Sequence, residues 1–236
     1  RPCIFVNFNS IAVFKHSLGI ISCMQFDWNN IDTVLLDMDG TLLDLHFDSH
    51  FWLEYMPRIW AAQNGFMLED ARRKLFAMLD QHAGTLNWYC VDFWSHTLDL
   101  DIMALKGQVA HKIGYLPTAE AFLRRCQQES DDVRMVTNAH RKVLDLKIKK
   151  TNIDQYFNQL LCSHELDHPK EDAEFWRRLH RNKAFDPERT LFIDDSEAVL
   201  ESAARHGIKY IYSIAKPDSS MHRKTPSRFL MLEDLA

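Results

Sequence analysis

The chain has 236 residues and a mass of 27.7 kDa, enough to bury a full core in one domain, with or without an insertion. Its formal charge of -5 at pH 7 provides no broad basic field, which argues against sequence-independent binding to nucleic acid or to an anionic membrane. We therefore expect a small soluble molecule as its partner.

Residues 1–23 differ from the rest of the chain. They contain no Asp or Glu, and the stretch that begins at Met24 resembles a natural start, so we expect an extra segment here whose place in the mature protein is open. A signal peptide is disfavoured because Lys15 and His16 interrupt the apolar run. Five cysteines without a C-x-x-C pair fit a reducing compartment, so we expect a cytoplasmic protein.

Five short apolar runs predict buried strands, at residues 33–36, 133–137, 159–162, 190–193 and 210–214. Helical patterns follow Pro117 and Ser196, and the second should end at Gly207. This alternation predicts an α/β fold with a Rossmann-like, doubly wound parallel sheet that helices cover on both faces.

The interval between the first two strands is too long for a simple crossover. It is rich in helix formers and carries four of the six tryptophans. We predict an inserted α-helical cap over residues 45–114, with hinges near Asp44 and at residues 114–117. The core domain would then comprise residues 24–44 and 115–236.

The stretch VLLDMDGTLLD, residues 34–44, runs from an apolar strand directly into Asp37, Asp39 and Gly40. The carboxyl edge of an open α/β sheet is where such folds bind ligands. Two carboxylates about 4 Å apart repel by about 4 kcal/mol at an effective dielectric constant near 20, so the pair requires a cation, a shared proton or a splayed backbone. A solvated turn would explain DMDG if it stood alone.

A second strand ends in the same way. LFIDDSE, residues 191–197, places Asp194 and Asp195 between an apolar strand and a helix. Two strands that each end in acids make an oxygen-rich site, which suits Mg²⁺ with a substrate phosphate.

A third strand ends in VTNAH, which offers the Thr137 hydroxyl and the Asn138 amides for phosphate oxygens, although simple helix capping explains them as well.

The segment HELDHPK, residues 164–170, matches the H-E-x-x-H pattern of zinc proteases. That pattern requires a helix, whereas Pro169 follows at once and a predicted strand ends at Cys162. We therefore predict a loop whose functional residue is Lys170. A lysine at this edge would offset the charge of several aspartates and a phosphate, although a solvated lysine is an equally good account of it in isolation.

In order and spacing, the four pieces DMDGT, VTNAH, PKED and LFIDD resemble the haloacid dehalogenase superfamily of phosphatases, over residues 31 to 215. The resemblance implies that Asp37 is the nucleophile that forms an aspartyl phosphate, and that Asp39 is the general acid and base. It also implies roles for the others: Thr137, Asn138 and Lys170 at the phosphate, and Asp37, Asp39 (through its backbone carbonyl), Asp194 and Asp195 at Mg²⁺. Dehalogenases of the superfamily lack the second aspartate, so the resemblance is to a phosphatase.

Longer strings, among them TLNWYC at residues 85–90, resemble the bacterial GMP/IMP nucleotidases of that superfamily. The expected substrate is therefore a purine 5′-nucleotide. Trp88 is our candidate for stacking on the base, whereas most other aromatic residues of the cap have the spacing of a buried helical stripe. A sugar phosphomutase, a sugar-phosphate phosphatase and a catalytically silent binding protein on the same fold remain alternatives.

Overall fold

The computed structural model describes residues 26–224 and 226–235, so the expectations for residues 1–23 lie outside the described residues. In the described part, all strands belong to one sheet in the order β3-β2-β1-β4-β5-β6. Every neighbouring pair is parallel. The strands are β1 (Thr33–Leu36), β2 (Asp132–Thr137), β3 (Gln159–Cys162), β4 (Thr190–Asp194), β5 (Tyr210–Ile214) and β6 (Leu230–Leu232).

The predicted parallel α/β fold and its five strands are confirmed, whereas β6 is an addition. This strand has only three residues, with Leu230 exposed and Leu232 buried, and so short a run has no pattern to distinguish it from a loop. It adds to the β5 edge of the sheet, where backbone pairing with Tyr210–Ile214 stabilises it.

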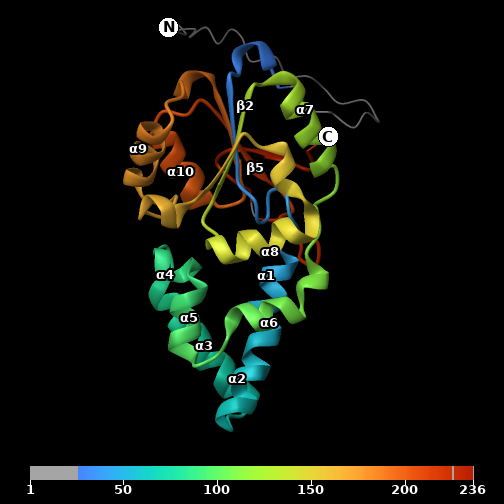
Figure 1. The fold of residues 1–236 in the computed structure, drawn as a ribbon, viewed down its shortest axis with the longest axis vertical. Helices are drawn as coiled ribbons and strands as arrows, with labels where there is room; N and C mark the ends of the chain where they lie inside the picture. The colour runs from blue at the N-terminus through green and yellow to red at the C-terminus, as the bar shows by residue number, and fades with distance from the viewer. Residues whose placement is uncertain (1–25, 225, 236) are drawn as a thin grey trace, which may run out of the picture.

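Both faces of the sheet are buried because successive side chains of a strand point to opposite sides. In β1, Val34 and Leu36 pack into one apolar cluster and Leu35 into the other. Figure 1 shows α7 on one side of the sheet and α9 and α10 on the other. The covering helices are α7 (Ala119–Glu129) and α8 (Arg141–Thr151) for the first cluster, and α9 (Ala173–Asn182) and α10 (Glu197–Arg205) for the second.

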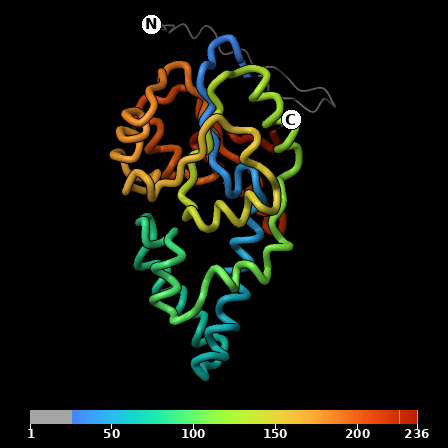
Figure 2. Tube along the Cα trace, viewed as in Figure 1, coloured from blue at the N-terminus to red at the C-terminus, as the bar shows by residue number. Residues whose placement is uncertain are grey.

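Residues 46–112, which we call the helical segment, form the lower end of the molecule in Figure 2 and contain no strand. The segment has an apolar core of its own, which Val143 of α8 joins. Its two connections to the rest of the chain lie side by side, because Asp44 N–H donates to the Gly114 carbonyl at 2.9 Å and Leu116 N–H to the Leu42 carbonyl at 2.9 Å. The main elements are α1 (His46–His50), η2 (Phe51–Tyr55), α2 (Met56–Asn64), α3 (Leu68–His82), α4 (Leu86–Tyr89), α5 (Val91–Leu98), α6 (Ile102–Gln108) and η3 (Ala110–Lys112).

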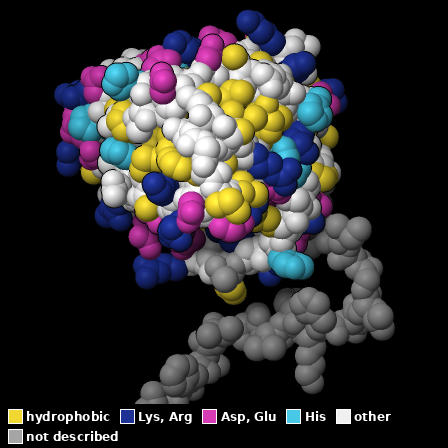
Figure 3. Space-filling model, turned by 90° about the horizontal axis from the view of Figure 1, so that it is seen from below, with side chains coloured by type: hydrophobic (Ala, Val, Ile, Leu, Met, Phe, Trp, Pro, Cys, Tyr) yellow, Lys and Arg dark blue, Asp and Glu magenta, His cyan; other side chains and the backbone are white. Residues whose placement is uncertain are grey.

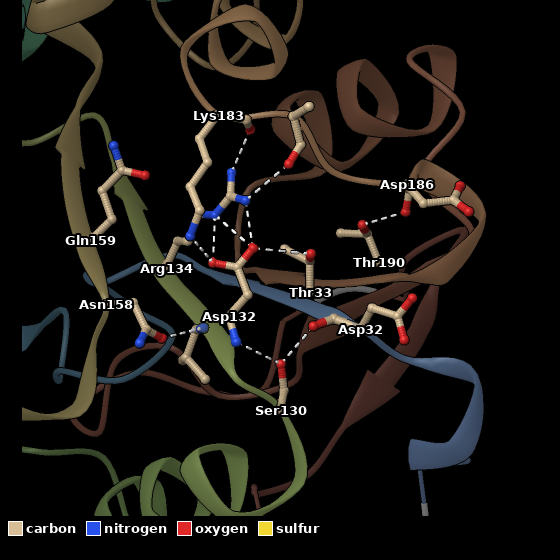
Figure 4. A network of polar contacts seen from close by, with 12 residues as sticks. Asp32, Thr33, Ser130, Asp132, Arg134, Asn158, Gln159, Lys183, Asp186 and Thr190 are labelled. Carbon is tan, nitrogen blue, oxygen red and sulfur yellow. Dashed lines mark hydrogen bonds and ion pairs between the residues drawn. The ribbon is translucent and has the colours of Figure 1, made fainter.

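At the amino end of β2, the guanidinium of Arg134 is fully buried (Figure 4). It donates to both carboxylate oxygens of Asp132 and to the carbonyls of Lys183 and Ala184. A buried charge requires such pairing, since a lone one would lose its hydration without compensation. The network ties the end of α9 to the sheet at the edge opposite to the one that Asp37 follows.

On the face seen in Figure 3, Lys and Arg side chains are interspersed with Asp and Glu side chains, so this face carries no field of a single sign. Among the described helices, none combines the length and the apolar character needed to cross a membrane. Cys90, Cys126 and Cys162 are free thiols.

Candidate active site

Three adjacent strands end in polar residues at one edge of the sheet. Asp37 follows β1, Thr137 ends β2 and Asp194 ends β4. Because Leu36 pairs with Ile193 across the sheet, Asp37 and Asp194 lie at the same level, and the Asp37 N–H donates to the Ile193 carbonyl at 3.1 Å. The parallel sheet therefore brings together residues from three separate sequence motifs.

Lys170 lies between two of these carboxylates. Its Nζ is 2.5 Å from Asp37 Oδ1 and 2.6 Å from Asp194 Oδ2, and all three residues are at most 5% exposed. Burial raises the pKa of Asp37 to about 6, with Asp194 adding to the effect and Lys170 opposing it. Burial alone would lower the pKa of Lys170, but the two carboxylates outweigh it and raise that pKa, so the ammonium stays charged.

The segment before Lys170 is a short 3-10 helix, Ser163–Leu166, followed by a left-handed turn at Asp167. His164 and His168 thus share no α-helix, and the helical condition for a zinc-protease motif is not met. Two bonds fix the loop: the Lys170 N–H donates to Asn138 Oδ1 at 2.9 Å, and the Lys170 carbonyl accepts from Trp176 Nε1 at 2.9 Å. The loop thereby delivers the ammonium to the sheet edge.

Three carboxylates converge beside this lysine. One oxygen each of Asp37, Asp194 and Asp195 lies within 4.8 Å of the others. Burial, together with repulsion from Asp194 and Asp37, raises the pKa of Asp195 well above its usual range. The turn after β1 leaves room for this carboxylate only because position 40 is glycine, since its φ is +83° and a Cβ there would lie 2.8 Å from Asp195 Cγ.

Asp39 belongs to a second, partly separate group of charges. Its Oδ1 accepts from Lys147 Nζ at 2.5 Å, and the same ammonium donates to Asp48 Oδ2 at 2.6 Å. Burial raises the pKa of Asp39 to about 6; Asp48 and Asp37 contribute to the rise, and Lys147 opposes it. Asp48 also accepts from Lys106 Nζ at 2.6 Å.

The two residues that follow β2 lie at the site but in different roles. The Thr137 hydroxyl accepts from the Ala139 N–H at 3.0 Å, which leaves its own proton able to donate to a ligand. The Asn138 carboxamide is engaged on both ends, because it accepts from Lys170 N–H and donates to Glu171 Oε2 at 2.9 Å. Tyr89 of the helical segment donates to the other Glu171 oxygen at 2.6 Å. The carboxamide thus braces the Lys170 loop against the helical segment.

A cavity of about 290 Å³ lies between the sheet edge and the helical segment. Its charged end is formed by the aspartates and Lys170, and four aromatic or apolar residues of the helical segment also line it, namely Trp52, Trp88, Tyr89 and Val91. Trp88, our candidate for stacking on the base, thus lines the cavity, and so does Trp52. Phe47, Phe51 and Trp94 are buried inside the helical segment, as the spacing of the aromatic stripe predicts.

Sequence reasoning missed the buried lysines near Asp39. One signal was available for Lys147, because it lies four residues after Val143 on the face of α8 that is otherwise apolar. A charged residue at a buried helical position requires a partner. Lys106 carried the same signal, because it lies four residues after the buried Ile102 of α6. No such signal marked Glu171, whose partner Tyr89 lies far away in the sequence.

Comparisons with known proteins agree with this geometry. The family model of the haloacid dehalogenase-like hydrolases matches residues 31–207. The GMP/IMP nucleotidase YrfG of Escherichia coli (strain K12) is 39% identical over 207 residues, which span 88% of this chain and 93% of that protein, and YrfG of Shigella flexneri matches equally well. Two solved structures share the fold over 87% of this chain. The first is a HAD phosphatase from Thermococcus onnurineus, with a TM-score of 0.70, 18% identity and 94% of its own chain covered. The second is the L-2-haloacid dehalogenase from Xanthobacter autotrophicus, with a TM-score of 0.59, 12% identity and 95% covered.

Proposed function

The chain belongs to the haloacid dehalogenase-like hydrolase family, and from this premise we propose that it hydrolyses a purine 5′-nucleotide through an aspartyl phosphate on Asp37. One observation carries the proposal: Asp37 is buried at the sheet edge, bonded to Lys170 and within reach of two further carboxylates. A carboxylate in that position is shielded from solvent and held in one orientation, as its attack on phosphorus requires.

The proposed reaction has two steps. In the first, an Asp37 carboxylate oxygen attacks phosphorus, the ester bond breaks, and Asp39 gives its proton to the departing oxygen. In the second, Asp39 takes a proton from water, the water oxygen attacks the phosphorus of the aspartyl phosphate, and phosphate leaves with the Asp37 carboxylate restored. A pKa near 6 suits Asp39 to both roles, because it can bind and release a proton near neutral pH.

The remaining core residues bind and orient. We propose that Lys170 holds Asp37 in position and offsets the charge of the transferring phosphoryl group, and that the Thr137 hydroxyl donates to a phosphate oxygen. The backbone beside Asn138 also contacts the phosphate, while the Asn138 carboxamide holds the Lys170 loop in place. The helical segment acts as a cap that covers the charged end of the cavity.

We further propose Mg²⁺ as the cofactor, held by Asp37, Asp194 and Asp195 together with the Asp39 carbonyl. The donor set fits, since it consists only of oxygen atoms. The charges fit too: Lys170 bonds to two of the three carboxylates and Lys224 lies beside Asp195, yet burial and repulsion from the other two carboxylates still raise the pKa of Asp195. Asp194 bonds to Lys170 and to the Ser196 N–H, so Asp195 is the less engaged carboxylate. When bound, the ion polarises a phosphoryl oxygen.

Phosphate release from a panel of esters tests substrate and cofactor together. With Mg²⁺ present, we expect GMP and IMP to be hydrolysed at least about tenfold faster, in kcat/KM, than AMP, UMP, glucose phosphates and phosphoglycolate, because discrimination between related substrates in one pocket has about this size. EDTA should stop turnover. Hydrolysis of sugar phosphates alone would discard the nucleotide, and metal-independent turnover would discard Mg²⁺. No hydrolysis at all would favour a phosphomutase or a silent binding protein.

Trp88→Ala tests the proposed stacking contact. Stacking of a base on an aromatic ring is worth about 1–3 kcal/mol, so we expect KM for GMP to rise about fivefold or more with kcat little changed. Trp60→Ala is the matched control, because Trp60 packs on Phe66 in the same helical segment and does not line the cavity. An unchanged KM in Trp88→Ala would remove this residue from the substrate site.

A further inference from the structure

A row of alternating charges with two buried lysines connects Asp39 to the helical segment. It runs from Asp39 to Lys147 of α8, on to Asp48 of α1, and ends at Lys106 of α6, with successive contacts of 2.5, 2.6 and 2.6 Å. Lys147 is 1% exposed and Lys106 is 2% exposed. The core therefore contributes the first two members of the row, Asp39 and Lys147, and the helical segment contributes the last two, Asp48 and Lys106.

Stability alone is a poor account of this row. Withdrawing two ammonium groups from water is unfavourable, and well-packed apolar side chains in place of a buried ion pair often stabilise a protein equally well or better. The surroundings are suitable for such packing, because Val143 and Leu144 on the same helix are buried and the Lys106 ammonium lies over the Phe47 and Phe51 rings. An explanation should therefore be sought in what the row does to Asp39.

Lys147 distinguishes the two oxygens of the Asp39 carboxyl group. Oδ1 accepts from the Lys147 ammonium, whereas Oδ2 has no hydrogen bond to any described residue. A lysine ammonium cannot accept a hydrogen bond, so the carboxyl proton of Asp39 cannot lie on Oδ1, the oxygen that faces Lys147. Asp39 also lines the cavity that contains Asp37 and Lys170.

We propose that Lys147 is a positioning residue for the general acid: by binding Oδ1 of Asp39, it holds Oδ2 as the oxygen that delivers the proton to the leaving group. Asp48 fixes the Lys147 ammonium from the helical segment, and Lys106 fixes Asp48. The acid is then correctly held only while the helical segment lies against α8. This inference rests on the proposed function and assigns a role within it.

The dependence on the leaving group tests the assignment. An alkoxide needs a proton to depart, whereas p-nitrophenolate departs readily without one, so a misplaced acid should affect alkyl esters selectively. In Lys147→Met we expect kcat/KM to fall about 10²-fold for the best alkyl phosphate of the substrate panel, but less than about tenfold for p-nitrophenyl phosphate. Lys147→Arg should recover part of the loss. Lys149→Met, an exposed lysine of the same helix, should behave as the unaltered protein.

The ratio of the two kcat/KM values protects the test from partial misfolding, because both substrates report on the same folded fraction. An equal loss on both esters in Lys147→Met would overturn the inference. Asp39→Asn separates this failure from that of the proposed function. If Asp39→Asn loses the alkyl ester selectively and Lys147→Met does not, only the role of Lys147 is wrong. Because hydrolysis of the aspartyl phosphate also needs Asp39, Asp39→Asn is judged by the rate at which each ester phosphorylates Asp37. If that rate falls equally for both esters, the proposed acid is wrong and the inference fails with it.

Discussion

Replacement of Asp37 by Asn is expected to abolish turnover while leaving the fold intact. Asn preserves the shape of the side chain but lacks the anionic oxygen that attacks phosphorus. We therefore expect kcat to fall by more than about 10⁴-fold, as it does when a nucleophile is removed from a set of catalytic residues that act together. The fold should persist because the change removes one negative charge from a cluster of three carboxylates and Lys170 keeps its ion pair with Asp194. The effect on thermal unfolding should therefore be small.

An acid-quench experiment identifies the cause of the loss. After brief mixing with substrate, the unaltered protein should carry a phosphoryl group on the peptide that contains Asp37, and Asp37→Asn should not. Asp131→Asn makes the same chemical change at an exposed position and should keep full activity. A phosphoryl group on another residue, or turnover in Asp37→Asn within about tenfold of the unaltered protein, would assign the nucleophile elsewhere.

Lys170→Met is expected to have the second-largest effect, on both catalysis and stability. Removing a cationic donor from a charge-stabilising site lowers kcat by about 10²- to 10³-fold. The same change leaves Asp37 and Asp194 without their shared partner, and removal of one member of a buried ion pair destabilises by about 3–5 kcal/mol. We expect a lower melting temperature together with the loss of kcat.

Two further variants separate the catalytic part of this effect from the structural part. Lys170→Arg retains the charge, so it should be more stable than Lys170→Met yet remain slow, since the guanidinium cannot occupy the same position between two carboxylates. Lys209→Met removes an exposed ion pair with Glu188 and should change neither quantity measurably. A well-folded Lys170→Met variant that keeps kcat within about tenfold would exclude Lys170 from the reaction.

The residues at the sheet edge were predictable because each of their motifs can be recognised within a short stretch of sequence. Each motif is an apolar run that ends in a polar residue, and a parallel sheet places all such ends at one edge. The strand order was not needed for this conclusion. Asp37, Thr137 and Asp194 would share that edge in any parallel arrangement, and the observed order β2-β1-β4 places Asp37 between the other two.

Lys170 was predictable for a weaker reason. The segment before it contains a proline and directly follows a strand. This pattern excludes a long helix but does not predict the direction of the Lys170 side chain. Its direction depends on contacts with Asn138 and Trp176, which come from other parts of the chain. Local patterning predicted the loop, and long-range hydrogen bonds decided the position of its ammonium.

The sequence by itself determined the fold class, the helical segment between the first two strands, and the residues at the sheet edge, because periodicity and strand endings are properties of short stretches. The tertiary structure alone decided which charges meet away from that edge: Lys147 with Asp39, Asp48 with Lys106, and Tyr89 with Glu171. The physical reason is the distance along the chain. Asp48 and Lys106 lie on separate helices, whereas Asp39 and Glu171 lie in loops that face a helix. The packing of these distant segments determines which of their side chains meet.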